Sequence, residues 1–299
     1  MKTTFLCVRA LTFVAVAATL VLPNAAHAYR TWLLPSGTIF SAKQPWVTVD
    51  AAMSNDLFTY EFRSPGLEDL VVLGPDGQRL KAQNLSDGPY RSSFDVKLDK
   101  QGTYRFALVT DSIRAFYTIG NEKMRLRGTA QSLAKEIPAN AEDLRVSYAL
   151  SRVEAFVTSG KPTTGAFKPT GLGIELVPVT HPNDLVVGET ATFRFLYNGK
   201  PAVGYNASVA VAGQRYRSEQ GEIRIKTDKN GEIKLKWVAA GMYFMKVTPP
   251  SASDAVGPGV GVQAAAGAAP AARPASFTGT LAEPVLRAHY SLTLEVLPN

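Results

Sequence analysis

The stretch DVKLDKQGTYRFALV, residues 95–109, combines the features that decide the fold. An alternating segment leads into a short turn that ends at Gly102, and Tyr104 is the second residue after that glycine. Alternation with a period of two is typical of a strand with one buried face. A tyrosine so early in a sandwich strand usually packs inward and donates its hydroxyl to nearby backbone. The stretch therefore predicts a hairpin that belongs to a β-sandwich.

A second stretch, EIKLKWVAAGMYFMKV at residues 232–247, follows the same plan. Gly241 takes the place of Gly102, and Tyr243 takes the place of Tyr104. One such unit in each half of the chain favours two β-sandwiches of related plan. A chance likeness between two hairpins is the alternative, because hairpins draw on few turn sequences.

The rest of the chain also consists mainly of short alternating segments, such as WVTVDAA at 46–52 and RSSFDVKL at 91–98. Asp-Gly and Asn-Gly supply the positive φ of tight strand reversals, and they occur in GPDGQ (74–78), YNGKP (197–201) and DKNGE (228–232). The one helix predicted is TAQSLAKEI at 129–137, which ends before Pro138. We therefore predict an all-β protein with a first β-sandwich domain over 29–165 and a second, Ig-like one over 172–299.

Two segments interrupt the alternation. Gly, Pro and Thr dominate residues 159–173, where we place the boundary between the domains. Residues 249–276 are rich in Ala, Gly and Pro, which bury too little surface to offset the entropy of ordering. Because RAHYSLTLEVLP at 287–298 then reads as a strong strand, we predict that 249–276 is a long disordered loop inside the second sandwich.

The N-terminus has the form of a secretory signal. Lys2 and Arg9 precede an apolar run, which ends in the small-residue triplet at 26–28. We predict cleavage after Ala28, a mature chain that begins at Tyr29, and a periplasmic location. The only cysteine, Cys7, leaves with the leader, so disulfides and thiolate metal sites are not expected. No later apolar run is long enough to predict a membrane span.

The net charge of the chain limits the kinds of partner that we expect. Of 32 basic and 25 acidic residues, the leader holds two basic ones, which leaves a mature net charge of +5. The basic residues are scattered, and nucleic acid is not expected as a partner. One stripe alternates along a predicted strand: Lys123, Arg125 and Arg127. It is consistent with a polyanion site, although a solvated strand face is the favoured interpretation.

The mature chain offers little catalytic chemistry. It has two histidines, and no Gly-x-Ser-x-Gly turn presents a nucleophile to either. A transition-metal site is the remaining option, with His181, His289 and Asp184 as ligands and Glu175 and Glu295 as further oxygens; imidazole and carboxylate suit nickel, copper or zinc. The alternative is that His181 is a loop residue and His289 an exposed strand residue.

Several blocks along the chain resemble a family of exported bacterial proteins of unknown function. They are AHAYRTWLLPSGTIF (26–40), WVTVDAAMSNDLF (46–58), YRSSFDVKLDKQGTYRFAL (90–108), RVEAFVTSGKPTT (152–164), GIELVPVTHPNDLVVGE (173–189) and TDKNGEIKLKWVAAGMY (227–243). The family is usually labelled as nickel-transport or nickel-uptake substrate-specific, with Ig-like folds. The resemblance implies a periplasmic accessory protein in metal acquisition, often beside outer-membrane receptors. Many relatives have a histidine where this chain has Tyr29, so an amino-terminal metal chelate is not expected here.

Three functions follow in order of preference. The first is a non-catalytic periplasmic accessory or binding protein, with nickel, cobalt or copper as the metal it would take up. The second is a structural interaction module that docks onto an envelope partner such as an outer-membrane receptor, through edge strands or the loop 249–276. An envelope hydrolase comes last, because no catalytic set is evident.

Overall fold

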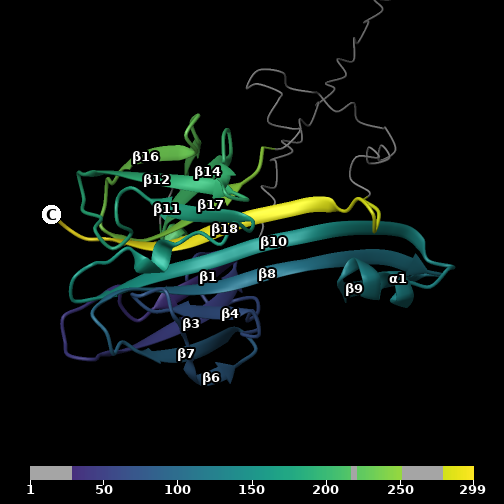
Figure 1. Ribbon diagram of the computed structural model, residues 1–299, viewed down its shortest axis with the longest axis horizontal. Coiled ribbons are helices and arrows are strands. Elements are labelled where there is room, and N and C mark those ends of the chain that lie inside the picture. Colours follow the sequence, from purple (N-terminus) through teal and green to yellow (C-terminus); the bar gives the residue numbers. More distant parts are fainter. Residues whose placement is uncertain (1–28, 217–220, 251–278) are drawn as a thin grey trace, which may run out of the picture.

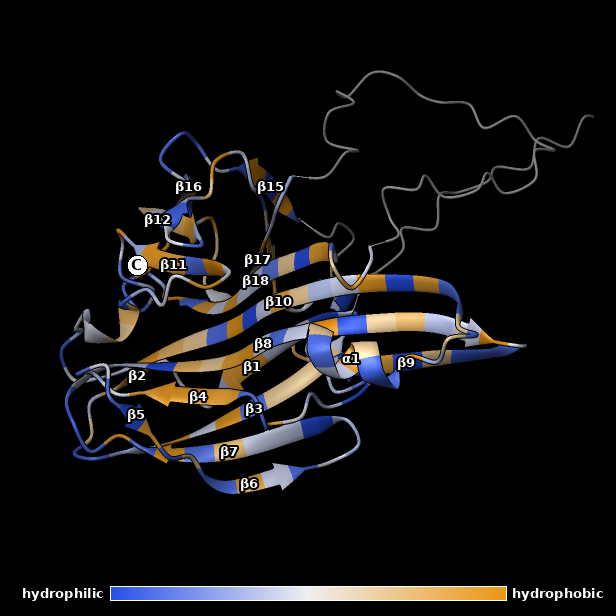
Figure 2. Ribbon diagram, turned by 45° about the vertical axis from the view of Figure 1, so that its right-hand side comes forward, coloured by the Kyte–Doolittle hydropathy of each residue, from blue (hydrophilic) through white to orange (hydrophobic). Residues whose placement is uncertain are grey.

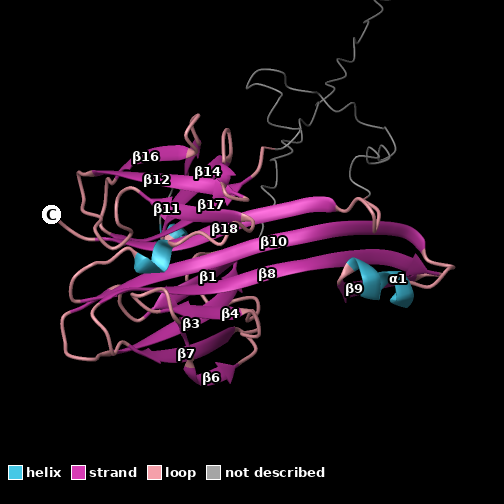
Figure 3. Ribbon diagram, viewed as in Figure 1, coloured by secondary structure: helices cyan, strands magenta, loops and turns pink. Residues whose placement is uncertain are grey.

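The computed structural model describes residues 29–216, 221–250 and 279–299. The predicted leader, 1–28, and nearly all of the predicted loop, 249–276, lie outside the described residues. The described part is mostly strand, with one α-helix and two short 3-10 helices (Figure 3). None of these helices is long and apolar enough to cross a membrane. The predicted all-β class is confirmed.

The first sandwich closes around side chains that the alternation assigned to one face. Val47 and Val49 are buried against Phe94 and Val96, and Phe94 meets Phe106 edge-on with ring centroids 5.9 Å apart. One wall is a sheet with the order β1 (Arg30–Pro35), β3 (Trp46–Ser54), β7 (Arg91–Lys97) and β6 (Gln83–Asp87). The other wall is formed by β4 (Leu70–Leu73), β5 (Arg79–Leu80), β8 (Gly102–Ile119) and β10 (Glu142–Ser159).

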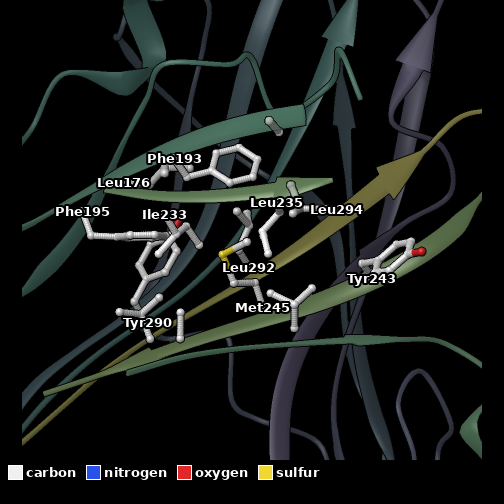
Figure 4. Close-up of a cluster of buried hydrophobic side chains, with 14 of the residues drawn as sticks. Leu176, Phe193, Phe195, Ile233, Leu235, Tyr243, Met245, Tyr290, Leu292 and Leu294 are labelled. Atoms are coloured by element: carbon white, nitrogen blue, oxygen red, sulfur yellow. The ribbon is translucent and has the colours of Figure 1, made fainter. Parts of the chain in front are cut away.

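The second sandwich is built in the same way. Four alternate residues of the strand predicted at 287–298 lie in its buried core: Tyr290, Leu292, Leu294 and Val296. The Tyr290 ring meets Phe195 there at 5.6 Å (Figure 4). One wall contains β11 (Ile174–Pro178), β12 (Thr190–Tyr197), β13 (Lys200–Pro201) and β16 (Glu232–Lys236). The other contains β14 (Asn206–Val211), β15 (Ile223–Lys226), β17 (Gly241–Thr248) and β18 (Val285–Val296).

A single sheet runs through both sandwiches (Figure 1). Its order is β15-β14-β17-β18-β10-β8-β4-β5, with β2 (Ile39–Phe40) on β10 and β9 (Glu122–Gly128) on β8. The junction is the parallel pair of β10 and β18. Val153 and Ala155 of β10 belong to the first core, whereas Leu150 and Phe156 belong to the second. We call the side of this sheet that carries Val153 its first face and the opposite side its second face.

The two longest strands extend beyond both sandwiches. β8 and β10 have 18 residues each and pair along nearly their whole length. Figures 1 and 2 show their far ends projecting with β9 and α1 (Ala130–Glu136), and we call residues 111–148 the arm. The helix predicted at 129–137 is confirmed, with a capping box between Thr129 and Ser132. Its Leu133 packs on Ala115 and Val146, so α1 covers the second face of the arm.

The predicted tyrosine corners are confirmed in both sandwiches. The Tyr104 hydroxyl donates to the carbonyl oxygen of Lys100 at 2.7 Å, and the Tyr243 hydroxyl donates to the carbonyl oxygen of Ala239 at 2.8 Å. Both bonds reach back four residues along the chain. The internal repeat seen in the sequence therefore has the same structural role twice.

Two of the three predicted hairpin turns are confirmed. Residues 74–78 join β4 to β5, and Asn198 and Gly199 join β12 to β13 with positive φ at both positions. The third prediction is wrong: the turn at 228–232 joins β15 to β16, which belong to different sheets. The turn chemistry is as expected, since Asp228 Oδ1 accepts from Asn230 N at 2.8 Å. The strands on either side find their partners elsewhere.

The first strand ties the two sandwiches together. Trp32 of β1 is fully buried and packs with Ala210 and Phe244 of the second half. Its indole N–H donates to Ser54 Oγ at 2.9 Å, which satisfies the buried donor. The first face of the shared sheet is therefore covered by β1 at this point.

Candidate functional site

His181 lies in the loop between β11 and β12, and both of its ring nitrogens are engaged. Nδ1 accepts from the Asn183 backbone N–H at 3.1 Å, and Nε2 lies 2.9 Å from Thr103 Oγ1. Because Nδ1 accepts, Nε2 carries the hydrogen and donates it to Thr103. The ring also meets Phe167 edge-on at 5.4 Å. Neither nitrogen has a lone pair free for a metal ion.

The hydrogen bonds of His181 continue into a buried network that joins the sandwiches. Thr103 and Thr158 are 3.1 Å apart through their hydroxyls, and Thr158 donates to Asn183 Oδ1 at 2.9 Å. Asn183 Nδ2 donates in turn to the Phe156 carbonyl at 2.9 Å. Burial lowers the pKa of His181, so the ring is neutral at pH 7 and fits this network. His181 thereby connects the loop of the second sandwich to β8 and β10.

The structure does not bring the two histidines together. His181 contacts Thr103, which pairs with Thr158 on β10, whereas His289 pairs with Ser151 on the same strand. Seven residues of strand separate Thr158 from Ser151, which is about 23 Å. The two rings also lie on opposite faces of the sheet. Two nitrogens that bind one ion must lie within about 4 Å of each other, so a metal site shared by His181 and His289 is incompatible with this geometry.

The predicted oxygen ligands are also dispersed. Asp184 is exposed, and its backbone N–H donates to the His181 carbonyl at 3.0 Å. Glu295 accepts a hydrogen bond from Thr38, and Glu175 is held in a buried ion pair. Across residues 29–216, 221–250 and 279–299, no three or more His, Cys, Asp or Glu side chains are grouped so that they could hold a metal ion.

The sequence analysis missed a buried charge network at the junction of the sandwiches. Glu154 of β10 lies 3.4 Å from the Arg152 guanidinium and 3.7 Å from Arg105 Nε, and it accepts from the Tyr290 hydroxyl at 2.7 Å. Arg152 also lies 3.4 Å from Glu175. All five side chains are almost completely buried. The available signal was the pair of charges in SRVEAF, inside an otherwise apolar strand.

His289 lies on the first face of the sheet, in a basic environment. Burial, followed by the charges of Lys246 and Arg114, lowers the pKa of His289 to about 4. Burial and the charge of Arg30 likewise lower the pKa of Lys246, against the opposing charge of Glu222. Positive charges of β1, β8 and β17 therefore lie near one another around His289 and Lys246.

A cavity of about 510 Å³ opens beside Lys246, over β14, β15 and β17. Its polar lining includes Asn206, Ser208, Glu222, Arg224, Lys246 and Thr248. Burial raises the pKa of Glu222, but hydrogen bonds with Arg224 and Ser208 and the nearby positive charges outweigh it and lower the pKa overall. Glu222 is thus an ionised, hydrogen-bonded acceptor. The cavity suits a small polar or charged group; Glu222 is paired with Arg224 at 3.0 Å, and Lys226 and Lys246 add positive charge to the lining.

Fold and buried polar groups together define the class: an all-β protein of two Ig-like sandwiches fused through one sheet, with its buried charges at the junction. The chain belongs to the family described as Domain of unknown function (DUF4198), whose model matches residues 26–249. The predicted family of unknown function is confirmed at this level. A comparison with curated proteins gives no match.

Solved structures with some similarity share little detail with this chain. They include a DUF4785 family protein from Legionella pneumophila (8% identity, TM-score 0.22, 71% of this chain and 50% of that one). The ICAM-5 D1–D4 ectodomain fragment matches at 10% identity and TM-score 0.19, over 73% of this chain and 45% of that one. The D0–D1 domain of Intimin matches at 13% identity and TM-score 0.19, over 74% of this chain and 91% of that one. The chain thus spans about half the length of the first two.

Proposed function

We propose that this protein is a non-catalytic accessory protein of the periplasm that docks onto an envelope partner, such as an outer-membrane receptor, through its arm. The observation that carries the proposal is the projection of β8 and β10 beyond both sandwich cores (Figure 1). Strands in a sandwich normally end where the core ends, because the extra backbone gains little burial to offset its ordering entropy. The arm buries a small core of its own only under α1, and its opposite face is left exposed, so a contact outside the chain would bury surface that the extension leaves open.

The surface of the arm supports this proposal. Phe116 of β8 and Met124 of β9 are each 38% exposed, and they project from opposite faces of the arm, because Phe116 lies opposite Arg125 and Met124 lies opposite Tyr117. Exposed large apolar side chains at a projecting edge favour contact with a partner. The arm is also held in shape by its own small core under α1, so it is ordered before any partner arrives. Preorganisation of this kind lowers the entropic cost of binding.

Site-specific photo-crosslinking tests the docking role. A photoreactive residue at position 116 or 124 should give cross-links to one envelope component in intact cells. The same residue at Tyr90 of the first sandwich or Val238 of the second, both exposed, serves as the control. Equal cross-linking from the control positions, or none from the arm, would rule out docking through the arm.

A shortened chain gives an independent test. Asp111 and Leu150 are partners in the β8–β10 ladder, so an Asn-Gly turn between them can replace residues 112–149. We expect this chain to keep both sandwich cores and to lose the cross-linked partner. A shortened chain that still recovers the partner would contradict the proposal.

The metal-uptake role stays a prediction that rests on the family label. The geometry supports it less than docking, because His181 and His289 lie apart and each is held in its own environment. Calorimetric titration of the mature chain with nickel, cobalt, copper and zinc tests it. We expect the His289→Ala variant to bind each metal as the unaltered chain does; loss of binding in that variant would restore His289 as a ligand.

A further inference from the structure

The basic stripe of β9 is one edge of a larger surface. In the sheet register, Arg127 lies opposite Arg114 of β8, and Arg125 lies opposite Phe116. Phe116 in turn lies opposite Arg145 of β10. Residues directly opposite one another project from the same face of a sheet, with Cβ atoms about 5 Å apart. The stripe therefore continues across three strands.

This surface lies on the first face of the arm, opposite α1. We call it the basic face and define it by six side chains, all exposed: Arg114, Lys123, Arg125, Arg127, Arg145 and Arg287. Arg287 joins it through β18, where it pairs with Ala149 of β10. The buried apolar residues Ala115 and Val146 point the other way, toward Leu133 of α1. The second face of the arm is thus covered by α1, and the first face is an exposed surface that carries the six basic side chains.

Few carboxylates offset these charges. Arg127 pairs with Asp69 at 2.8 Å, and Glu142 lies opposite Thr118 at the tip of the arm. Among the described residues, no carboxylate lies within ion-pair distance of the other five cations of the basic face. Partial burial and the charges of Arg127, Arg125 and Arg63 lower the pKa of Arg114. Like charges placed opposite one another on a sheet are destabilising, so an external anion would relieve a real repulsion.

The shape and composition of the basic face favour an extended anionic surface over a small anion. The basic face is the exposed surface of paired strands, and the cavity of about 510 Å³ lies over β14, β15 and β17 instead. Phe116, 38% exposed, sits between Arg125 and Arg145. An aromatic ring among cations matches the boundary between headgroups and acyl chains, where the ring is partly buried and the cations meet phosphates.

We propose that the basic face of the arm binds the anionic headgroups of a phospholipid surface. This inference rests on the proposed docking role of the arm, and it deepens that role by placing the arm against the membrane that holds the partner. The arm would then lie with its first face on the bilayer and α1 turned away from it.

Co-sedimentation with lipid vesicles tests the proposal. The mature chain, residues 29–299, is mixed with vesicles that contain phosphatidylglycerol or with vesicles of phosphatidylcholine alone, at low and high salt. We expect binding to the anionic vesicles only, and weaker binding at high salt because screening shortens the reach of the charges. Absence of binding to phosphatidylglycerol vesicles at low salt would overturn the proposal.

Matched variants assign the binding to the basic face. Each cation removed should weaken partitioning about five-fold, so Arg114→Gln/Arg125→Gln/Arg145→Gln should weaken it by about two orders of magnitude. The control is Arg79→Gln/Lys81→Gln/Lys229→Gln, three exposed cations elsewhere with the same total charge; it should bind within about two-fold of the unaltered chain. Equal loss in both variants would mean that net charge alone drives binding, and would overturn the proposal.

Two further measurements separate the alternatives. Binding of heparin without binding of vesicles would overturn the membrane assignment in favour of a soluble polyanion. Thermal unfolding shows that both triple variants are folded, and Phe116→Ser, which keeps every charge, should also weaken vesicle binding. Cross-linking from position 124 to a protein partner tests the docking role alone. If cross-linking succeeds and vesicle binding fails, the docking role stands and the membrane inference is overturned.

Discussion

Tyr104 and Tyr243 are single residues that set a corner of each sandwich. Tyr104 is 1% exposed, and its hydroxyl both donates to the Lys100 carbonyl and accepts from the Lys100 N–H at 2.8 Å. Replacing tyrosine with phenylalanine keeps the ring in the core but removes both bonds. The two backbone groups of Lys100 would then lose their partner.

We expect Tyr104→Phe to lower the free energy of unfolding by about 1–3 kcal/mol, the usual cost of leaving buried polar groups unsatisfied. Tyr90→Phe is the matched control, because Tyr90 is 53% exposed and surface changes usually stay within about 0.5 kcal/mol. Urea unfolding measures both. Equal values for the two variants would show that the corner contributes nothing.

His289 gives a pH dependence whose sign follows from its environment. Its folded pKa is about 4, below its ordinary value of 6.5, so the unfolded chain takes up the proton first as pH falls. Stability is therefore full above pH 6.5 and is lost as pH falls from 6.5 toward 4. The lowered pKa of His181 acts in the same direction.

We expect His289→Gln to reduce the loss of unfolding free energy between pH 7 and pH 4 by about 2 kcal/mol, a discounted value for a side chain that is only partly buried. Urea unfolding at a series of pH values measures this. An identical pH slope in the variant and the unaltered chain would show that His289 is not desolvated in the folded protein.

At the scale of elements, β10 is the strand that both sandwiches share. It supplies apolar side chains to both cores, and it also carries Arg152 and Glu154. Glu154 is the carboxylate shared by two buried guanidiniums, and Arg105 Nε and Arg152 Nε have no hydrogen-bond partner. Among the described residues, Arg105 therefore depends on Glu154 for its ion pair, whereas Arg152 also has Glu175 at 3.4 Å.

We expect Glu154→Gln to lower the free energy of unfolding by about 3–5 kcal/mol, because it leaves buried positive charge without its partner. Glu189→Gln, at an exposed position, is the control. Adding Arg105→Met to Glu154→Gln should recover part of the loss, since it removes one unpaired charge. If Glu154→Gln alone is as stable as the control, the buried charge network is not desolvated in the folded protein.

The sequence predicted what local patterns control. Strand faces, the helix at 129–137, both tyrosine corners and two hairpins follow from alternation and turn residues that lie close together in the chain. The turn at 228–232 was predicted wrongly because the same Asn-Gly chemistry serves a crossing between sheets. Local sequence fixes the reversal of the chain, and only distant strands decide which sheet each side joins.

The candidate site shows the same division. The loop position of His181 could be predicted, but its distance from His289 depends on the register of β10 with β18, where Ser151 meets His289. That register is set by the packing of two cores that are far apart in sequence. The basic face is likewise a product of register, because only pairing places Arg114 and Arg145 beside the stripe on β9.

At the scale of the whole molecule, we expect the shared sheet to hold the sandwiches and the arm as one rigid body. Three connections act together: the β10–β18 pair, the buried charges around Glu154, and β1 with Trp32 packed on Phe244. An arm that docks onto a partner benefits from this stiffness, because a hinge would add an entropic cost to binding. Rigidity is the property on which both the docking role and the basic face depend.

Distances between spin labels test this rigidity most directly. In a chain produced from Tyr29 onward, which lacks Cys7, the labels are carried in pairs by cysteines introduced at Gly120 on the arm tip, Lys97 in the first sandwich and Lys229 in the second. Pulsed electron paramagnetic resonance should give one narrow distance distribution for each pair. Broad or multiple distances between either sandwich and the arm would contradict a single rigid body.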